Sequence, residues 1–144
     1  MQPIEADALF EDWHETAIRV RYAETDQMGV VYHANYLVWF EIARIDYLAR
    51  FEGGYPALLD AGVDATTVEA NVRYRAPARF GDGLQIGARC LDVRGARFRF
   101  EYAVRRDGAL LADGWTAHAC VDTRTLRPTR VPAFLVDAIA AAEA

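Results

Sequence analysis

Apolar and polar residues alternate along five segments of this chain, which is the pattern of strands that bury one face. These segments are residues 14–25, 68–76, 84–93, 98–104 and 109–121. Gly95 and the pair Asp107–Gly108 fall between the last three segments and predict hairpin turns there. The alternation changes phase near Cys90 and Leu91, which indicates a bulge. The pattern therefore predicts a mostly antiparallel sheet with one apolar face.

The segment from Asn35 to Arg50 has a different pattern, because apolar residues cover most of the circumference of a predicted helix. Its polar positions after Asn35 are Glu41, Arg44, Asp46 and Arg50. A helix that is apolar nearly all round must be surrounded by protein, so we expect the sheet to curl around it. The helix should stop before residues 53–56, which include two glycines and a proline, and a short closing helix is expected on the outside at about 132–143. One long helix on one antiparallel sheet is a two-layer α+β domain.

The composition restricts the class of protein. The chain has 144 residues, of which 53% are hydrophobic, and this suits one folded domain. It has no run of about 18 apolar residues that would span a membrane, and its acidic beginning is unlike a signal peptide. Cys90 and Cys120 are too few for a disulfide scaffold, and their spacing matches no metal motif. We therefore expect a cytoplasmic protein.

The charge of the chain bears on its partners. A net charge of −5 disfavours a protein that binds nucleic acid through a basic surface. All 16 basic residues are arginine. This usage suits a genome-wide compositional bias, but the planar guanidinium is also well shaped to bind phosphate groups. Composition leaves both interpretations open.

The stretch YAETDQMGVVYHANYLVWFEIAR, residues 22–44, resembles the signature of the acyl-CoA thioesterase family that includes the 4-hydroxybenzoyl-CoA thioesterases. The order of elements over residues 14–123 resembles the hot-dog fold of that family, in which a curled antiparallel sheet of about five strands wraps a long buried helix. The segment VRYRAPARFGDGLQI resembles the family's strand after the helix. The resemblance implies that residues 1–144 form one hot-dog thioesterase domain, which hydrolyses an aromatic or short- to medium-chain acyl-CoA to the free acid and CoA.

The resemblance also implies what the enzyme assembles with and what it does without. It implies a homo-oligomer, either a dimer or a tetramer of dimers, with each site between two subunits. It implies no metal, cofactor or prosthetic group beyond the CoA of the substrate.

The residues of the motif suit this chemistry on their own terms. A carboxylate such as Asp26 can attack a thioester carbonyl or activate water. A free backbone N–H at a helix start, here that of His33, can bind the oxyanion that forms. Gly29 allows a backbone path that a side chain would restrict. The candidate catalytic residues are thus Asp26 and His33, and the candidate substrate-binding residues are Gly29, Tyr32, Asn35 and Tyr36.

Each assignment has a structural alternative. Asp26 could be a turn or capping residue. The imidazole of His33 could orient the thioester, bond Asp26 or only pack. Tyr32 and Tyr36 could be core aromatics, and Tyr22 is expected in the core, with its hydroxyl able to border the site.

Other polar residues are weaker candidates. Glu41 could supply a helix carboxylate, but an ion pair with Arg44 suits its spacing better. His14 and His118 are expected at the surface or on a strand face, and the three histidines do not have metal-ligand spacing. Candidates for the CoA phosphates are Arg73, Arg75 and Arg79, with solvated sheet charges as the simpler interpretation.

Two other functions stay open. A hydroxyacyl-thioester dehydratase on the same fold pairs a histidine with a carboxylate, which Asp26 and His33 could supply. In that reaction, however, the two groups normally come from different elements, whereas here they share one loop. A non-catalytic acyl-binding module is the second alternative, because a fold alone does not settle function.

Overall fold

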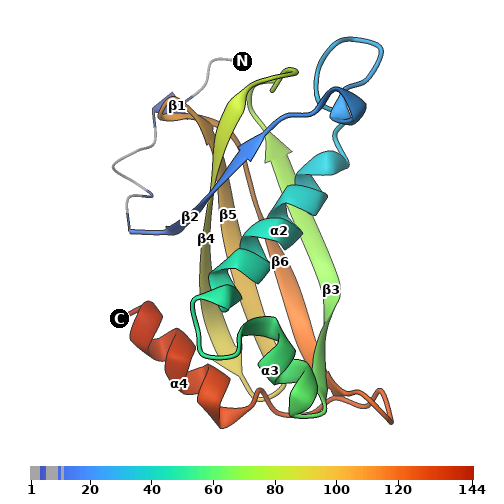
Figure 1. Ribbon diagram of the computed structural model, residues 1–144, viewed down its shortest axis with the longest axis vertical. Coiled ribbons are helices and arrows are strands. Elements are labelled where there is room, and N and C mark those ends of the chain that lie inside the picture. The colour runs from blue at the N-terminus through green and yellow to red at the C-terminus, as the bar shows by residue number, and fades with distance from the viewer. Residues whose placement is uncertain (1–3, 6–9, 11) are drawn as a thin grey trace.

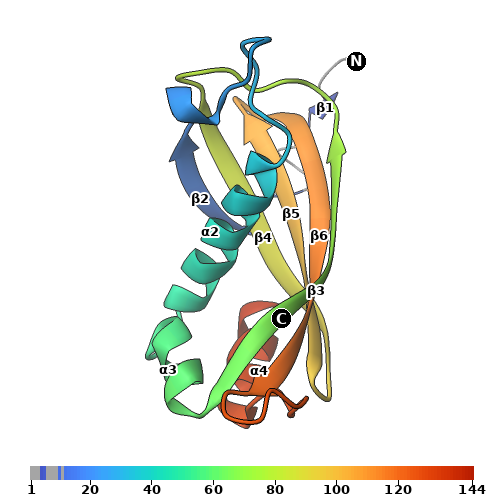
Figure 2. The same cartoon turned by 90° about the vertical axis from the view of Figure 1, so that its right-hand side faces the viewer.

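An antiparallel sheet forms one layer of the protein, and helix α2 lies along its concave face (Figures 1 and 2). The computed structural model describes residues 4–5, 10 and 12–144. The strands are β1 (Ile4–Glu5), β2 (His14–Arg19), β3 (Val63–Tyr74), β4 (Gly83–Arg94), β5 (Arg97–Arg106) and β6 (Ala109–Asp122). Their order is β2, β4, β5, β6, and both β3 and β1 pair with the other side of β6. The helical elements are the 3-10 turn η1 (Tyr22–Glu24), α2 (Asn35–Ala49), α3 (Gly54–Asp60) and α4 (Ala133–Ala142).

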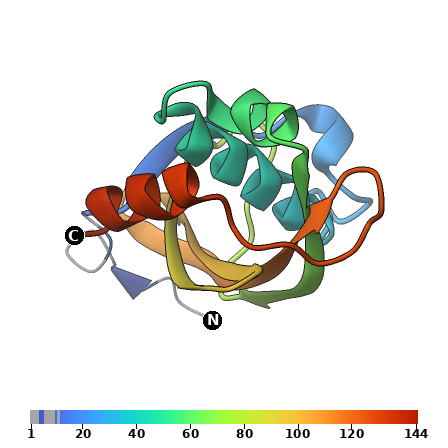
Figure 3. The ribbon, with the colours of Figure 1, turned by 90° about the horizontal axis from the view of Figure 1, so that it is seen from below.

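Helix α2 packs one face into the sheet. Trp39, Phe40, Ala43 and Tyr47 lie on this face and are fully buried. The ring of Phe40 stacks on Tyr102 of β5, with the two centroids 4.2 Å apart. Figure 3 shows the sheet curving beneath the helix. The predicted α+β hot-dog architecture is confirmed.

The outer face of α2 is less covered than the sequence suggested. Leu37, Val38, Ile42 and Ile45 are 40–47% exposed. The strands cover α2 from one side only, and the surfaces of α2 and α3 that point away from the sheet are not covered by strands (Figures 2 and 3). The expectation that this chain buries the helix on most sides is therefore wrong for the described residues. The all-round apolar pattern instead gives α2 an exposed apolar stripe.

The start of the chain and the segment after α2 differ from the predictions in three respects. β2 ends at Arg19 rather than continuing to about residue 25, and part of the remainder forms η1. The segment expected only to stop α2 begins the short helix α3, directly after Gly53 takes a left-handed φ of 81°. β3 begins at Val63, earlier than predicted, and its pairing with β6 shifts register between Thr67 and Glu69.

The predicted hairpin turns are confirmed. Asp107 and Gly108 both have positive φ, 51° and 81°, as a type I′ turn requires. Gly95 also has a positive φ, of 59°, between β4 and β5. The bulge in β4 lies between Leu91 and Arg94, slightly beyond its predicted position.

Helix α4 closes the end of the molecule opposite the motif loop, as Figure 1 shows. The carboxylate of Glu143 accepts hydrogen bonds from the Tyr47 hydroxyl at 2.5 Å and from the Cys90 N–H at 3.1 Å. Burial, reinforced by the bond to Glu143, raises the pKa of Tyr47 far above its ordinary value. Cys90 and Cys120 are buried free thiols. Among the described residues, no helix has the length and apolarity to cross a membrane.

Candidate active site

The loop between η1 and α2 is folded on itself by short hydrogen bonds. The Asp26 N–H donates to the Val30 carbonyl at 2.8 Å, and the Gly29 N–H donates to the Asp26 carbonyl at 3.0 Å. Gly29 has a φ of +77°, and a Cβ there would meet no atom within 4 Å. The backbone conformation, not lack of space, therefore favours glycine at this position.

Asp26 is half-buried and lines two neighbouring hollows, of about 360 Å³ and 660 Å³. Its Oδ1 accepts a hydrogen bond from the Met28 N–H at 2.8 Å. This contact is the one expected if Asp26 were a turn residue, which was the alternative to a catalytic role. No hydrogen bond or ion pair within the described chain engages Oδ2. One carboxylate oxygen thus holds the turn, and the other is available to a ligand.

His33 lines the smaller hollow together with Asp26. Its ring is exposed and lies against Tyr32, with centroids 4.4 Å apart. Its carbonyl accepts a hydrogen bond from the Tyr74 hydroxyl at 2.8 Å. In the described part of the chain, no backbone carbonyl accepts its N–H, and no hydrogen bond joins its imidazole to Asp26. The His33 N–H, which precedes α2, therefore has no partner among the described residues, and an oxyanion donor must be free in this way.

The smaller hollow is walled by aromatic and aliphatic groups from two parts of the chain. Tyr36 of α2 is 3% exposed and meets Tyr74 of β3 edge to face, with centroids 5.0 Å apart. Burial raises the pKa of both hydroxyls, so both are neutral donors at pH 7. Val30 and Val31 complete the wall on the motif side. Tyr36 is thus both a core residue and a wall of the candidate site.

Glu24 is a functional candidate that the sequence analysis missed. It is only 5% exposed, yet it carries a carboxylate. Oε1 accepts the Arg21 N–H at 2.8 Å, and Oε2 accepts the indole N–H of Trp39 at 2.9 Å. Burial opposes the charged form, but these hydrogen bonds and the charge of Arg21 outweigh it and hold the pKa of Glu24 below its ordinary value.

The main chain of Glu24 also ties the loop to the helix start. Its carbonyl accepts the Asn35 side-chain amide at 2.8 Å and the Tyr32 N–H at 2.8 Å. Both ends of the segment that contains Asp26 are therefore fixed to one residue. No reliable signal in the sequence indicated the burial of Glu24, because β2 ends at Arg19 and the same period-2 alternation also placed the exposed Tyr22 on the buried face.

The remaining predicted substrate-binding residues divide into two kinds. Asn35 is engaged with Glu24, although it also lines the larger hollow. Tyr32 is 48% exposed at that hollow, so the alternative of a core residue is wrong for it. Tyr22 was expected in the core and is 72% exposed, because η1 turns its ring outward against Phe80.

Tyr74 was also missed as a site residue. The alternation of the predicted strand 68–76 placed it on the apolar face with Val72, which indicates a side chain directed towards the helix. Nothing in the local sequence indicates that its hydroxyl reaches a carbonyl 41 positions away.

His14, His118 and Glu41 lie outside the two hollows that Asp26 lines. Glu41 is 3.7 Å from Arg44, which confirms the predicted ion pair. His14 has a partner after all, because its Nε2 lies 2.8 Å from the Asp46 carboxylate. His118 lies on a strand face as expected but is 1% exposed, and burial lowers its pKa to about 3. Within the described chain, no cluster of three metal-ligating side chains occurs.

The three arginines proposed for the CoA phosphates have different surroundings. Arg73 and Arg75 both pair with Asp113, at 3.2 Å and 3.1 Å. Arg79 is exposed, and its backbone forms a bridge with Val30 of the motif loop. Arg79 is therefore the member of this group that lies beside the motif loop and forms no ion pair among the described residues.

Comparison with known proteins gives a consistent result. The family described as the thioesterase-like superfamily matches residues 20–139. The chain is 33% identical over 120 residues to the acyl-CoA thioester hydrolase YbgC of Escherichia coli O6:H1, covering 83% of this chain and 90% of YbgC. The crystal structure of TT1821 from Thermus thermophilus matches with a TM-score of 0.83 and 41% identity, covering 88% of this chain and 97% of that one. The DHNA-CoA thioesterase of Staphylococcus aureus matches with a TM-score of 0.81 and 30% identity, covering 91% and 88%.

Proposed function

The chain belongs to the thioesterase-like superfamily, and on this premise we propose that it hydrolyses an acyl-CoA thioester with Asp26 as the essential carboxylate. One observation carries the proposal. Asp26 and His33 line the same hollow, where a carboxylate oxygen and a backbone N–H both lack partners among the described residues. A hydrolase needs these two groups on either side of the scissile carbonyl.

The reaction follows from these positions. The His33 N–H donates to the carbonyl oxygen as negative charge develops, and one such donor is worth about 3–4 kcal/mol of barrier. Asp26 either attacks the carbonyl carbon, forming an anhydride that water then cleaves, or takes a proton from water as the water attacks. In both routes the C–S bond breaks and CoA leaves as the thiolate. The apolar walls of Val30, Val31 and Tyr36 favour an aromatic or short- to medium-chain acyl group.

The proposed enzyme is a homo-oligomer in which a second subunit pairs along β3. Residues 66–70 of β3 are exposed, and in the described chain β3 has a partner strand only on the β6 side. A long open edge of this kind is normally protected or paired. Tyr74 and residues 75–77, which follow the edge, line the hollow of Asp26. A subunit docked on β3 would therefore border the site and help to exclude water.

Thiol release from a panel of acyl-CoA thioesters tests the activity, with Asp26→Asn as the variant. Asparagine keeps the oxygen that accepts the Met28 N–H, so the turn should survive while the nucleophile or base is lost. Asp122→Asn is the matched control, because Asp122 also accepts backbone N–H groups in a turn, at 2.8 Å and 3.0 Å. The expected result is turnover with at least one acyl-CoA that falls by at least a hundredfold in Asp26→Asn only.

Other outcomes would redirect the assignment. Turnover that survives Asp26→Asn would contradict the role of this carboxylate, and Glu41 would be tested next. Loss of enoyl-CoA absorbance without thiol release would indicate the dehydratase. CoA binding without any turnover would indicate an acyl-binding module.

Single-turnover hydrolysis in ¹⁸O water separates the two roles of Asp26. Water that cleaves the anhydride at the Asp26 carbonyl leaves ¹⁸O in this side chain, so label in Asp26 would establish attack by the carboxylate. Base catalysis puts the label in the product acid alone.

Light scattering of Val68→Asp tests the subunit contact, because a charge on this exposed edge residue should shift the protein towards monomer.

A further inference from the structure

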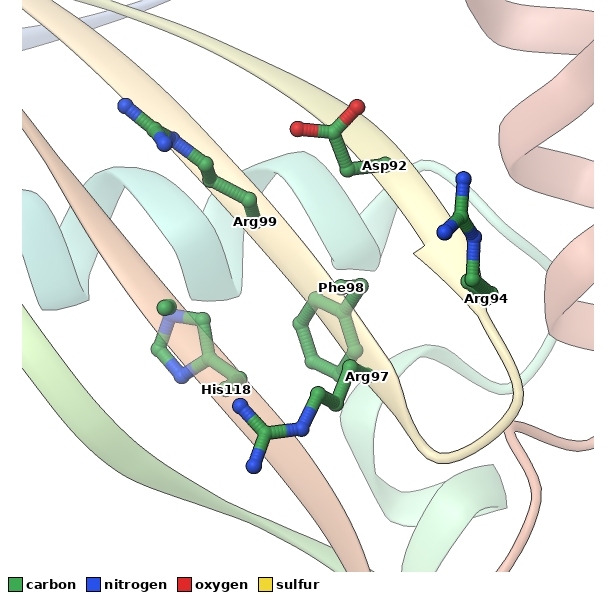
Figure 4. Close-up of a pocket in the computed structure, with 7 residues that line it drawn as sticks. Asp92, Arg94, Arg97, Phe98, Arg99 and His118 are labelled. Carbon is green, nitrogen blue, oxygen red and sulfur yellow. The ribbon is translucent and has the colours of Figure 1, made fainter.

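The sheet face opposite α2 carries a hollow lined by arginines at the end of β4 and the start of β5. Its volume is about 460 Å³, and its lining residues are Asp92, Arg94, Arg97, Phe98, Arg99, Ala117 and His118. Figure 4 shows Arg94, Arg97 and Arg99 around it, with α2 behind the strands. Arg94 and Arg97 flank the β4–β5 turn, so this hollow lies at the other end of the molecule from the motif loop (Figure 1).

Within the described residues, Arg94, Arg97 and Arg99 form no ion pair, whereas Arg73, Arg75, Arg89 and Arg106 each do. The contrast is informative because the chain has 21 acidic residues and only 16 basic ones. Acidic partners are therefore available in number, but Asp92 is the one carboxylate that lines this hollow.

The strand register places two of these arginines opposite each other in the backbone. Arg94 and Arg97 are direct partners across the β4–β5 ladder, and both are exposed. Their side chains point in different directions, with Arg97 directed towards His118 (Figure 4). An anion bound at the hollow would offset the local excess of positive charge.

The guanidinium of Arg99 is held in place by stacking on Trp115. Its guanidinium carbon lies 4.3 Å from the centroid of the Trp115 ring, and its Nε is buried without a hydrogen-bond partner in the described structure. Stacking on an indole fixes the plane of a guanidinium and leaves its terminal N–H groups free. Less side-chain entropy is then lost when a ligand accepts those N–H groups.

Asp92 is the one carboxylate of the hollow, and its backbone is unusual. It has a φ of 55°, a conformation that residues other than glycine rarely adopt, and it lies in the bulge between Leu91 and Arg94. Strained positions of this kind gather at functional sites. With three arginines and one aspartate, the hollow keeps an excess of positive charge.

We propose that this arginine hollow binds phosphate groups. Guanidinium groups bind phosphate oxygens through pairs of parallel N–H donors, and the excess positive charge selects an anion of at least two charges. The phosphates can come from the nucleotide end of CoA or from a free nucleotide. In a two-fold dimer paired through antiparallel β3 strands, the hollow of one subunit lies at the motif-loop end of the other. The CoA source rests on the proposed function, but the binding of phosphate does not.

Calorimetric titration of the full chain with pyrophosphate and with 3′-phosphoadenosine 5′-phosphate tests the site. The variant is Arg97→Gln with Arg99→Gln, and Arg124→Gln with Arg127→Gln is the matched control from an exposed loop. The hollow variant should bind at least tenfold more weakly than wild type, and the control should bind like wild type. Asp92→Asn should bind severalfold more tightly, because asparagine tolerates the left-handed backbone and removes the negative charge. No binding by wild type, or equal loss in both double variants, would overturn the proposal.

Kinetics with two thioesters of the same acyl group identify the source of the phosphate. The N-acetylcysteamine thioester lacks the nucleotide and so cannot reach the hollow. If CoA is the source, the hollow variant raises KM for the acyl-CoA alone and leaves kcat unchanged. If titration affinity falls while both KM values stay the same, the ligand is a free phosphate compound. If the hollow variant loses activity equally with both thioesters, the arginines serve the fold and the proposal is wrong.

If the wild-type protein hydrolyses no thioester, the proposed function is wrong. The calorimetric titrations alone then test the phosphate site.

Discussion

Glu24→Gln should destabilise the protein and misplace Asp26, because one buried carboxylate joins the motif loop to α2. The wild-type oxygens accept two donors, the Arg21 N–H and the Trp39 indole N–H, at 2.8 Å and 2.9 Å. A glutamine offers one oxygen and one NH₂ group. One of the two donors must therefore face another donor inside the protein.

The magnitude follows from these two contacts. An unsatisfied buried donor costs about 1–3 kcal/mol, and a hydrogen bond to a charged group contributes about 1.5–3 kcal/mol. The guanidinium of Arg21 adds almost nothing, because it lies 3.6 Å away and is 73% exposed. We expect Glu24→Gln to lower the free energy of unfolding by about 2–4 kcal/mol at pH 7. A domain of ordinary stability, about 5–15 kcal/mol, would remain folded.

The pH dependence distinguishes this contact from general damage to the core. The folded-state pKa of Glu24 lies below its ordinary value of 4.5, so its stabilisation is fully present above pH 4.5 and is lost as pH falls through the folded-state pKa. Urea unfolding of wild type and Glu24→Gln should therefore show a difference that is large at pH 7 and shrinks in acid. Glu101→Gln, which breaks a half-exposed pair with Arg89, should cost less than about 1 kcal/mol.

Activity provides a second measurement on the same variant. If Glu24 positions the loop, kcat should fall at least tenfold with a smaller change in KM, because Asp26 moves relative to the bound carbonyl. The indole N–H resonance of Trp39 should shift as it loses its carboxylate acceptor. A stability difference below about 0.5 kcal/mol that does not change with pH would contradict this role of Glu24, since it would mean that the carboxylate accepts no buried charge-assisted hydrogen bonds.

Three further predictions concern other parts of the structure. Gly114→Ala should lower the free energy of unfolding in urea by about 3 kcal/mol or more, because a Cβ would lie 2.1 Å from the Asn71 carbonyl oxygen. Its control is Gly83→Ala, which should be nearly neutral because a Cβ there meets no atom within 4 Å. In the wild type, His118 has a pKa of about 3 in the folded state, so between pH 6.5 and pH 3 only the unfolded state takes up a proton at this residue. The free energy of unfolding therefore falls by on the order of 1 kcal/mol for each unit that the pH decreases in this range, and His118→Gln should remove this dependence. Tyr74→Phe should lower kcat about 2- to 10-fold in the thiol-release assay without loss of fold, because it removes one neutral hydrogen bond, worth about 0.5–1.5 kcal/mol, to the His33 carbonyl.

The part of the candidate site that lies within one short loop could be predicted from the sequence. Asp26 and His33 come together in one hollow because they belong to one short loop before α2, and Gly29 permits the turn between them. The structure also shows that Asp26 combines two roles that sequence reasoning treated as alternatives. One oxygen makes the turn contact with Met28, the other has no described partner, and the residue lines the hollow.

The partners of the site could not be predicted in the same way. Trp39 lies 15 residues from Glu24, and Tyr74 lies 41 residues from His33. Period-2 alternation placed Tyr74 on the apolar face of its strand, but the sequence did not indicate which atoms these side chains meet. The distance between two such atoms depends on how α2 sits against the sheet, and that depends on the packing of the whole core.

Strand alternation, the long apolar segment and the positive-φ turn residues act through local geometry, so the sequence was enough to predict the four long strands, helix α2 and the closing helix α4. It also determined the motif, whose residues are neighbours along the chain. The packing of the layers determined that α2 keeps an apolar stripe uncovered, that Glu24 is buried beneath the loop, and that Arg94, Arg97 and Arg99 line one hollow without an ion pair among the described residues. Each of these depends on which surfaces the folded chain covers. Burial and unpaired charge belong to the assembled layers, and no single segment specifies them.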